Sequence, residues 1–267
     1  MQAFFISIPH SGERVPPEVS WLSGLTEAHL MRDVDRYVDQ LYKPVIDSLA
    51  IPSIVTEWHR YVVDLNRTPD EFDSVAVMGA KEPPGTFPKG LHWTITTHKE
   101  PLIERPMSMD LHKSLVENYY DPFHRGVKKF FADFKDQGFK NVYQLDCHSM
   151  PSEGTKLHAD FGEKRAEVVI SDGPDKSCNK EYRDLVVESY KSAGFEVKMN
   201  WPYIGGGITQ TYGQPDKGQN TIQVELNRRL YMDEETKKKS HPLFEETQKK
   251  LAVAIERIYT NIKNLPS

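Results

Sequence analysis

The sequence predicts an α/β protein built as three layers, α/β/α, with a mixed and largely parallel central sheet. Two observations lead to this prediction. Apolar runs of strand length alternate with longer segments of helical periodicity, a pattern typical of sheets covered by helices on both faces. Several of the apolar runs also end in polar or charged residues, at the edge where sheets of this class bind ligands. A chain of 267 residues fits one large domain, and we predict a single domain over residues 1–267.

Composition narrows the classes of partner. The formal net charge of -5 gives no reason to expect nucleic acid or an anionic membrane surface as a partner. No run approaches 18 apolar residues, and the amino terminus lacks the features of a secretory leader. The two cysteines, Cys147 and Cys178, are too few for a disulfide framework. We therefore expect a cytoplasmic protein that acts on a small molecule, and the sequence leaves its oligomeric state open.

The first predicted strand covers residues 3–8 and stops at a proline, which places His10 just past the strand end. After a proline-rich loop, apolar residues at helical spacing predict a helix over residues 26–49, shortened or kinked by an internal proline. This helix carries Asp33 and Asp35, which are two residues apart and therefore face different directions. One of the two carboxylates can point at a site while the other points away.

The segment 51–66 predicts two short strands, the second of which ends in Asp64-Leu65-Asn66-Arg67. Because arginine is not a favoured turn residue, Arg67 is a candidate anchor for a carboxylate, with a surface salt bridge as the alternative. Residues 81–106 are rich in Pro, Gly, Thr and His without periodicity, and they predict a long loop or lid over the site. Residues 109–137 predict one or two helices with a proline break.

The central strand of the prediction covers residues 142–148. Strand side chains alternate between faces, so Gln144, Asp146 and His148 share one side, with His148 at the carboxyl end of the strand. The remaining predicted elements are a strand at 166–170, a helix at 179–193, a strand at 195–199, a strand at 221–228 and a helix at 245–262.

Two histidines at strand ends indicate a metal site. If their strands are neighbours in the sheet, His10 and His148 lie close together, and two imidazoles with a carboxylate form a ligand set of catalytic zinc. In the last predicted strand, Glu225 lies on the face opposite the apolar residues. An unpaired buried carboxylate costs on the order of several kcal/mol, so we expect Glu225 to face either a partner charge or the site.

Six motifs together make the chain resemble the N-formylglutamate amidohydrolase family. They keep the order of that family and cover roughly residues 4–235. The most specific are Asp64-Leu65-Asn66-Arg67 and Glu225-x-Asn227-Arg228-x-Leu230-Tyr231-Met232. The other matching pieces are Pro9-His10-Ser11-Gly12, Asp33-x-Asp35 running into Leu41-Tyr42, Asp146-x-His148-Ser149-Met150 and Gly206-x-x-Thr209-x-x-Tyr212-Gly213.

The resemblance implies a fold of the phosphorylase/hydrolase-like and zinc carboxypeptidase-like type, with one catalytic zinc or another divalent metal. It also implies hydrolysis of N-formyl-L-glutamate, an acidic small molecule, to formate and L-glutamate. His10 and His148 are then two of the metal ligands. For the third ligand the resemblance favours Asp35, ahead of Glu13, which has the His-x-x-Glu spacing of carboxypeptidase-like sites, and ahead of Asp33.

The same resemblance suggests roles for the other site residues. Glu225 would take a proton from the attacking water and pass it to the leaving amine, with His148 beside it as the second catalytic residue. A glutamate-type substrate offers two carboxylates, which arginine side chains bind well. The candidate substrate-binding residues are Asn66, Arg67 and Arg228, and Arg228 reaches the side of Glu225 only if the chain bends just before it.

Three alternatives stay open from the sequence. Ser171-Asp172-Gly173 stands where family members commonly carry Gly-Asp-Arg, which favours a deacylase or carboxypeptidase-like hydrolase of another N-acyl amino acid. In the second alternative, Cys147 is the nucleophile of a metal-free hydrolase with His124 or another histidine as its base, although a buried cysteine facing away from His148 is usually inert. In the third, the protein binds acidic small molecules without turning them over.

Overall fold

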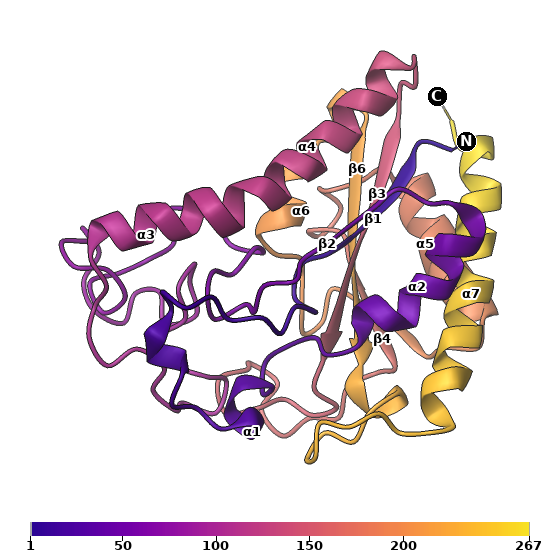
Figure 1. The fold of residues 1–267 in the computed structure, drawn as a ribbon. Helices are drawn as coiled ribbons and strands as arrows, with labels where there is room; N and C mark the ends of the chain where they lie inside the picture. The colour runs from indigo at the N-terminus through magenta and orange to yellow at the C-terminus, as the bar shows by residue number, and fades with distance from the viewer. Residues whose placement is uncertain (1, 267) are drawn as a thin grey trace.

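The structure is a computed structural model that describes residues 2–266, and it has the three layers expected from the sequence (Figure 1). The strands are β1 (Phe4–Ile8), β2 (Ser53–Val55), β3 (Val142–Met150), β4 (Val168–Ser171), β5 (Val197–Met199) and β6 (Gln219–Asn227). They form one sheet in the order β2-β1-β3-β6-β4-β5. β2, β1, β3 and β6 are parallel, whereas β4 is antiparallel to β6 and pairs with β5 in parallel. The predicted mixed, largely parallel sheet is therefore confirmed.

Helices cover both faces of this sheet. The stretch from residue 109 to residue 136 is helical throughout but contains a π-helix, Val116–Tyr120, just before Pro122. Proline lacks the N–H that an α-helical turn needs, and the wider π turn accommodates it. The α-helices are α1 (Glu27–Leu30), α2 (Val38–Leu49), α3 (Met109–Leu115), α4 (Asp121–Asp136), α5 (Lys180–Ser192), α6 (Gly207–Tyr212) and α7 (Leu243–Asn261).

The alternation of side chains along β1 divides the core into two layers. Phe4 and Ile6 point to one face, where they join a buried cluster with α2, α5 and α7, and α7 packs against both α2 and α5. Phe5 points to the other face and packs against Phe131 of α4 in a second cluster. Figure 1 shows α3, α4 and α6 on this second side. Burial of each such side chain contributes roughly 1.5–3 kcal/mol, so both helical layers are held mainly by apolar contact.

The predicted helix over residues 26–49 is wrong in its middle. It forms two separate helices, α1 and α2, because polar tertiary bonds replace the helical ones between them. The Asp35 amide donates to the His10 carbonyl oxygen at 2.9 Å, and the Asp33 carboxylate accepts from Thr97. Tyr37, at the start of α2, has a φ of 70°, which a continuous helix does not allow. Asp33 and Asp35 therefore lie in an irregular segment beside the sheet.

The second strand predicted within residues 51–66 is also wrong. Only β2 forms there, and residues 59–67 make a chain of turns instead. Asp64 and Asn66 are the reason, because both are buried and take polar partners rather than a strand neighbour. The buried side chains of Asp64 and Asn66 thus find their hydrogen-bond partners from turns rather than from a strand.

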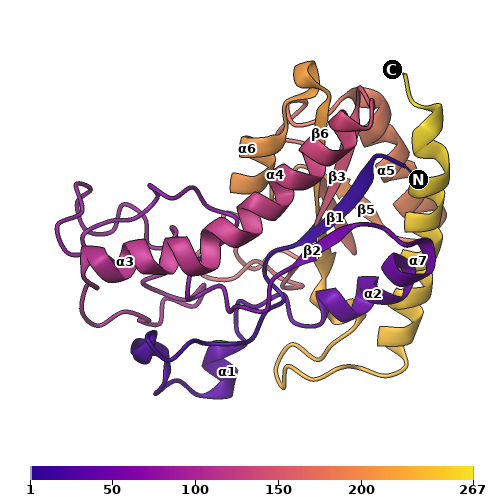
Figure 2. The ribbon, with the colours of Figure 1, turned by 45° about the horizontal axis from the view of Figure 1, so that its top comes forward.

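A long irregular segment joins β2 to α3 and spreads, together with α1, beyond the carboxyl ends of the central strands (Figures 1 and 2). It includes residues 81–106, which form isolated bridges but no helix or extended strand. Whether these residues move as a lid stays a prediction, as does the assignment of one domain. Within residues 2–266, no helix is both long and apolar enough to cross a bilayer.

Buried histidines on the α4 side of the sheet link stability to pH. The Nε2–H of His124 donates to the Leu65 carbonyl oxygen at 2.9 Å, and its Nδ1 accepts from the Tyr212 hydroxyl at 2.8 Å. Burial lowers the pKa of His124 from 6.5 to about 4, and burial with the neighbouring His112 lowers the pKa of His92 to about 3. The unfolded chain binds these protons near pH 6.5 and the folded chain does not. Their contribution to stability is therefore complete above pH 6.5 and is lost as the pH falls towards 4.

We predict that the free energy of unfolding, measured by urea titration, decreases between pH 7 and pH 5. Below pH 6.5, each of these histidines contributes a slope of up to about 1.4 kcal/mol per pH unit. The His124→Gln variant should show a shallower slope, and His241→Gln, at an exposed position, should keep the wild-type slope. Equal slopes in wild type and His124→Gln would contradict this explanation.

Candidate functional site

The candidate site is a cavity of about 190 Å³ at the carboxyl edge of the three central strands. β1 leads into His10, β3 carries His148, and β6 carries Glu225 directly beside His148 in the ladder. Parallel neighbouring strands present their carboxyl ends at one edge, which is why residues far apart in sequence meet here. The cavity is lined by those three residues and by Asp33, Asp35, Arg60, Asn66, Arg67, Lys89, Trp93, Thr97, Ser149, Pro151, His158, Tyr203, Gly205, Gly206, Gln223 and Arg228.

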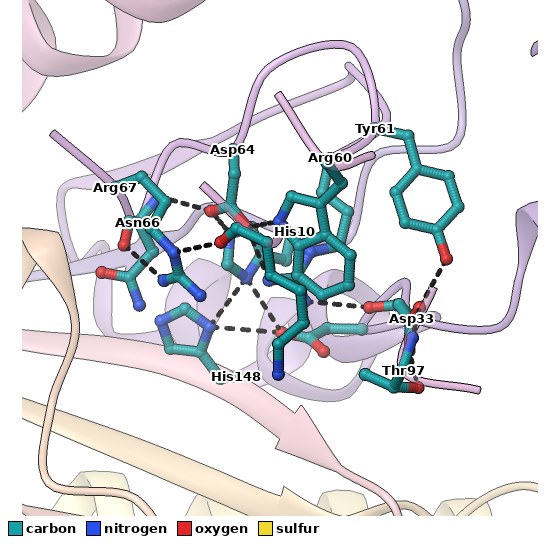
Figure 3. Close-up of polar contacts among 12 residues, drawn as sticks. His10, Asp33, Arg60, Tyr61, Asp64, Asn66, Arg67, Thr97 and His148 are labelled. Carbon is teal, nitrogen blue, oxygen red and sulfur yellow. Dashed lines mark hydrogen bonds and ion pairs between the residues drawn. The ribbon is translucent and has the colours of Figure 1, made fainter. Parts of the chain in front are cut away.

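Three buried side chains converge on one point of this cavity. The Nδ1 atoms of His10 and His148 are 3.1 Å apart. Asp35 Oδ2 lies 3.2 Å from His148 Nδ1 and 3.5 Å from His10 Nδ1. Each residue offers one ligand atom, and these atoms lie within 4.8 Å of one another. Figure 3 shows the two imidazole rings turned towards each other.

A carboxylate behind each histidine fixes the orientation of its ring. His10 Nε2 is 2.7 Å from Asp64 Oδ1, and His148 Nε2 is 2.8 Å from Asp146 Oδ2. In a neutral imidazole one nitrogen is a donor and the other an acceptor, so each Nε2 carries the proton. Both Nδ1 lone pairs then point into the space they share with the Asp35 carboxylate. A carboxylate on the far nitrogen is the usual support of a metal-binding histidine.

The residues present fit a divalent cation on the chemistry of their donors. Two lone pairs at 3.1 Å and a carboxylate repel one another unless positive charge lies between them. Burial favours neutral His148, but Asp146 and Asp35 outweigh burial and raise the pKa of His148 well above its usual value. The cluster thus attracts a proton, as it would attract a metal ion. Two histidines and one carboxylate are a known ligand set for catalytic zinc.

Asp64 is itself held by several donors. Its carboxylate accepts from Arg60 and from the indole of Trp93, both at 2.8 Å, and from the Asn66 amide at 2.8 Å. Burial favours the protonated acid, but the contact with His10 and the positive charge of Arg60 hold the pKa of Asp64 well below its usual value. This carboxylate therefore stays ionised, and it connects the turns of residues 59–67 to the predicted lid.

Arg228 holds Asp35 rather than standing free for a ligand. β6 ends at Asn227, and a 3-10 helix, Arg228–Leu230, turns the side chain back to the cavity, so the bend that this prediction required is present. Arg228 Nη2 donates to Asp35 Oδ1 at 3.0 Å, its Nε donates to Ser149 at 3.1 Å, and its Nη1 donates to a backbone carbonyl. Burial favours the neutral acid, but the histidines and Arg228 keep the pKa of Asp35 well below its usual value.

Glu225 lies on the cavity side of β6, where its prediction placed it. It is 6% exposed, and its Oε1 accepts from the Gln223 amide at 2.9 Å. Burial raises the pKa of Glu225 to about 7, and the positive charge of His148 limits the increase. A carboxyl group with a pKa near neutrality can both accept and release a proton at physiological pH.

The other two candidate ligands lie outside the three-residue cluster. Glu13 is half exposed, and its carboxylate pairs with Arg36 at 2.8 Å. His10 is not followed by a helix, so the spacing His-x-x-Glu does not return the fourth residue to the side of the first. Asp33 lines the cavity, but its carboxylate already accepts from the Tyr61 hydroxyl at 2.6 Å and from the side chain and amide of Thr97.

One wall of the cavity carries positive charge without a matching carboxylate. Arg67 donates only to the carbonyl oxygens of Lys89 and Asn66, at 2.8 Å each. Lys89 lies in the predicted lid and is half buried. Burial and the charge of Arg67 lower the pKa of Lys89. Within residues 2–266 neither cation has a carboxylate partner, so this wall suits an anionic ligand.

The Asn66 side chain is used for positioning. Its Oδ1 accepts from the Ile208 amide at 2.9 Å and its Nδ2 donates to Gln223 at 3.2 Å. Gly206 packs directly on it, because a Cβ there would come within 2.3 Å of Asn66 Nδ2. Asn66 thus ties the β2–α3 segment to the start of α6 and to β6.

The arrangement does not support a cysteine nucleophile. Cys147 is fully buried in the cluster with α2, α5 and α7, on the opposite face of β3 from His148. Burial raises the pKa of its thiol well above the usual value, which disfavours the reactive thiolate. His124, the base proposed for it, is occupied by Leu65 and Tyr212 on the other face of the sheet.

Sequence reasoning missed four residues of this site, namely Asp64 as the partner of His10, Arg60, Lys89 and Tyr203. Asp64 had a signal, because it opens the Asp-Leu-Asn-Arg motif, but no role was assigned to it. Lys89 and Tyr203 had no such sequence signal, since both lie in irregular segments where no periodicity indicates which way a side chain points.

Comparison with known proteins shows the family of this chain. Residues 2–232 match the family model described as N-formylglutamate amidohydrolase. Two curated relatives are named N-formylglutamate deformylase. The one from Pseudomonas aeruginosa is 28% identical over 234 residues, 86% of this chain and 82% of the relative. The one from Pseudomonas putida is 30% identical over 233 residues, 86% of this chain and 81% of the relative.

A solved structure shares the fold. The crystal structure of N-formylglutamate amidohydrolase from Ralstonia eutropha JMP134 superposes with a TM-score of 0.85 at 22% identity, covering 98% of this chain and 95% of that one. A family model that spans most of the sequence and a structure that superposes over nearly its whole length agree with each other. The chain therefore belongs to the N-formylglutamate amidohydrolase family.

Proposed function

We propose that this protein hydrolyses the amide of N-formyl-L-glutamate to formate and L-glutamate. We propose further that the reaction uses one divalent metal ion, with zinc as the first candidate. The observation that carries the proposal is the convergence of His10, His148 and Asp35 beside Glu225, a carboxyl group with a pKa near neutrality. Family membership and the names of the two Pseudomonas relatives support the choice of reaction.

His10 Nδ1, His148 Nδ1 and Asp35 Oδ2 would hold the metal. Bound there, a zinc ion lowers the pKa of water and polarises an amide carbonyl. Asp64 and Asp146 keep the two Nδ1 atoms unprotonated, and Arg228 with Ser149 leaves Asp35 Oδ2 directed at the histidines.

Glu225 carries the proton in this proposal. Its carboxylate takes a proton from the attacking water while the water oxygen bonds to the formyl carbon. It then returns this proton to the amide nitrogen as the C–N bond breaks, which releases formate and the amine of glutamate. Gln223 holds Oε1 of Glu225 at 2.9 Å, which leaves Oε2 for the transfer. General acid–base catalysis of this kind typically contributes about 10²- to 10⁴-fold in rate.

Arg67 and Lys89 bind a substrate carboxylate in this proposal. They are neighbouring cations without an acidic partner in the described chain, and Arg228, which the sequence suggested for this role, is occupied by Asp35. The bound anion would relieve the repulsion between the two cations, so affinity should depend on the acidic group of the substrate.

Removal of metal should abolish formate release, and zinc should restore it. We predict that Asp35→Asn weakens zinc binding, measured by calorimetry, by at least about 100-fold, since even loss of a partner behind a ligand typically costs about 10- to 100-fold. The matched control is Glu13→Gln, which should bind zinc like the wild type. Wild-type affinity in Asp35→Asn together with loss in Glu13→Gln would reverse the ligand assignment.

The Glu225→Gln variant should lose about 10²- to 10⁴-fold in kcat for formate release while it keeps its bound zinc, because the amide cannot accept a proton. Elemental analysis checks the metal in the same samples. Glu163→Gln, at an exposed position, serves as the control and should retain full activity. Substantial kcat in zinc-loaded Glu225→Gln would exclude Glu225 as the proton carrier.

The Lys89→Met variant should raise KM for N-formyl-L-glutamate by about 10- to 100-fold with little change in kcat, since a hydrogen bond to a charged group is worth about 1.5–3 kcal/mol. Lys81→Met, at an exposed position of the same segment, should leave KM unchanged. If Lys89→Met keeps the wild-type KM, the acidic group of the substrate is bound elsewhere.

A further inference from the structure

Tyr203 lines the cavity from the segment between β5 and α6, and its side chain ends in a hydroxyl group. Its backbone is held by a hydrogen bond from Ser171 Oγ to its carbonyl oxygen, at 2.8 Å. Nothing in the roles assigned above uses this hydroxyl. Its hydrogen bonds, taken one at a time, determine where its proton points.

His158 donates to the Tyr203 oxygen. The backbone amide of Thr155 donates to His158 Nδ1 at 3.0 Å, so Nδ1 is the unprotonated nitrogen of the ring. Burial lowers the pKa of His158 to about 4, and the ring is neutral near pH 7. The remaining proton is therefore on Nε2, which lies 3.1 Å from Tyr203 Oη and can only donate to it.

Arg165 is the second donor to the same oxygen. Its Nη1 lies 3.1 Å from Tyr203 Oη. The guanidinium is fixed by Asp160, which accepts from Nε at 2.7 Å and from Nη2 at 2.8 Å, and both of these residues are buried. Arginine has donors only, so the Tyr203 oxygen accepts this hydrogen bond as well.

The hydroxyl proton of Tyr203 is left without an acceptor. A phenolic oxygen accepts up to two hydrogen bonds and donates one, and His158 and Arg165 supply both that it accepts. Within residues 2–266, Tyr203 Oη has no other hydrogen-bond partner. Because both protein partners donate to the lone pairs of the oxygen, the O–H bond is directed away from them. Its proton is therefore available to a molecule in the cavity.

The surroundings indicate which oxygen it binds. A substrate carboxylate carries a permanent negative charge, and Arg67 and Lys89 match this charge on another part of the cavity wall. Tyr203 is neutral. Burial and the negative charge of Glu225 raise the pKa of Tyr203, so the phenol stays protonated and acts as a donor. A fixed neutral donor polarised by Arg165 gains most when charge develops on its acceptor during the reaction.

We propose that Tyr203 is a further catalytic residue, whose hydroxyl donates a hydrogen bond to the carbonyl oxygen of the scissile amide and stabilises the charge this oxygen acquires. His158 and Arg165 are positioning residues for it. This inference rests on the proposed function, and it adds a residue that the sequence motifs do not include.

The test compares Tyr203→Phe with wild type in formate release from N-formyl-L-glutamate. We expect kcat to fall by about 10²- to 10³-fold, as is typical for loss of one such donor, with little change in KM. The affinity for L-glutamate, measured by calorimetry, should also stay unchanged, because the product lacks the reacting carbonyl. Tyr119→Phe, which loses a hydroxyl bonded to Glu18 outside the cavity, is the matched control and should keep wild-type kcat.

A double-mutant cycle provides the second readout. His158→Leu should lower kcat in the wild-type background and have no further effect in Tyr203→Phe, because it acts only through the hydroxyl. Additive losses would overturn the positioning role. Unchanged kcat in Tyr203→Phe, or a raised KM with wild-type kcat, would overturn the role of Tyr203 alone and leave the proposed reaction intact. Failure of wild type to release formate would instead overturn the proposed function and this inference with it.

Discussion

The site depends on the hydrogen bonds that Asp64 and Asp146 accept from the far nitrogens of His10 and His148. They hold both Nε2 protons outward and direct both Nδ1 lone pairs at one point, where Asp35 adds a carboxylate oxygen. Such an arrangement is unfavourable without a cation between the donors, because it brings electron pairs together in a buried region. The carboxylates of Asp64 and Asp146 thus orient the site for a cation that they would not contact themselves.

The sheet and the loops contribute to this arrangement in different ways. Parallel pairing of β1, β3 and β6 brings His10, His148 and Glu225 to one edge through regular backbone geometry. Asp35 and Asp64 come from irregular segments, which have no ladder to hold them and depend on buried polar bonds. Asp64 takes four donors from three parts of the chain, so its loss would release the His10 ring, the turns of residues 59–67 and Trp93 together.

The sequence predicted the parts of the site that follow from strand geometry. Alternation along β3 placed Asp146 and His148 on one face, and the strand end placed His10 beside them, as the structure has them. Asp35 was identified only through a family motif, because the helix predicted around it does not form. Glu13, the second choice for the third ligand, lies outside the cluster of His10, His148 and Asp35 and pairs with Arg36 instead.

Arg228 and Lys89 show why the rest required the structure. The position of Arg228 in the cavity was foreseen, but its role depends on how many of its donors the fold already uses, and Asp35 with Ser149 takes them. Lys89 and Tyr203 lie in segments that are ordered by tertiary polar contacts, which leave no periodic trace in the sequence. Fold class was predictable for the opposite reason, because the apolar pattern that defines it repeats along the whole chain.

The X-ray absorption spectrum of the zinc-loaded protein at the zinc K-edge would show directly which side chains hold the metal. We predict that the zinc has two imidazole nitrogens as ligands and that its remaining ligands are oxygen atoms, and that one nitrogen is lost in His10→Ala and in His148→Ala. A sulfur ligand, or a zinc environment that is unchanged by either substitution, would contradict the assignment of the metal to His10, His148 and Asp35.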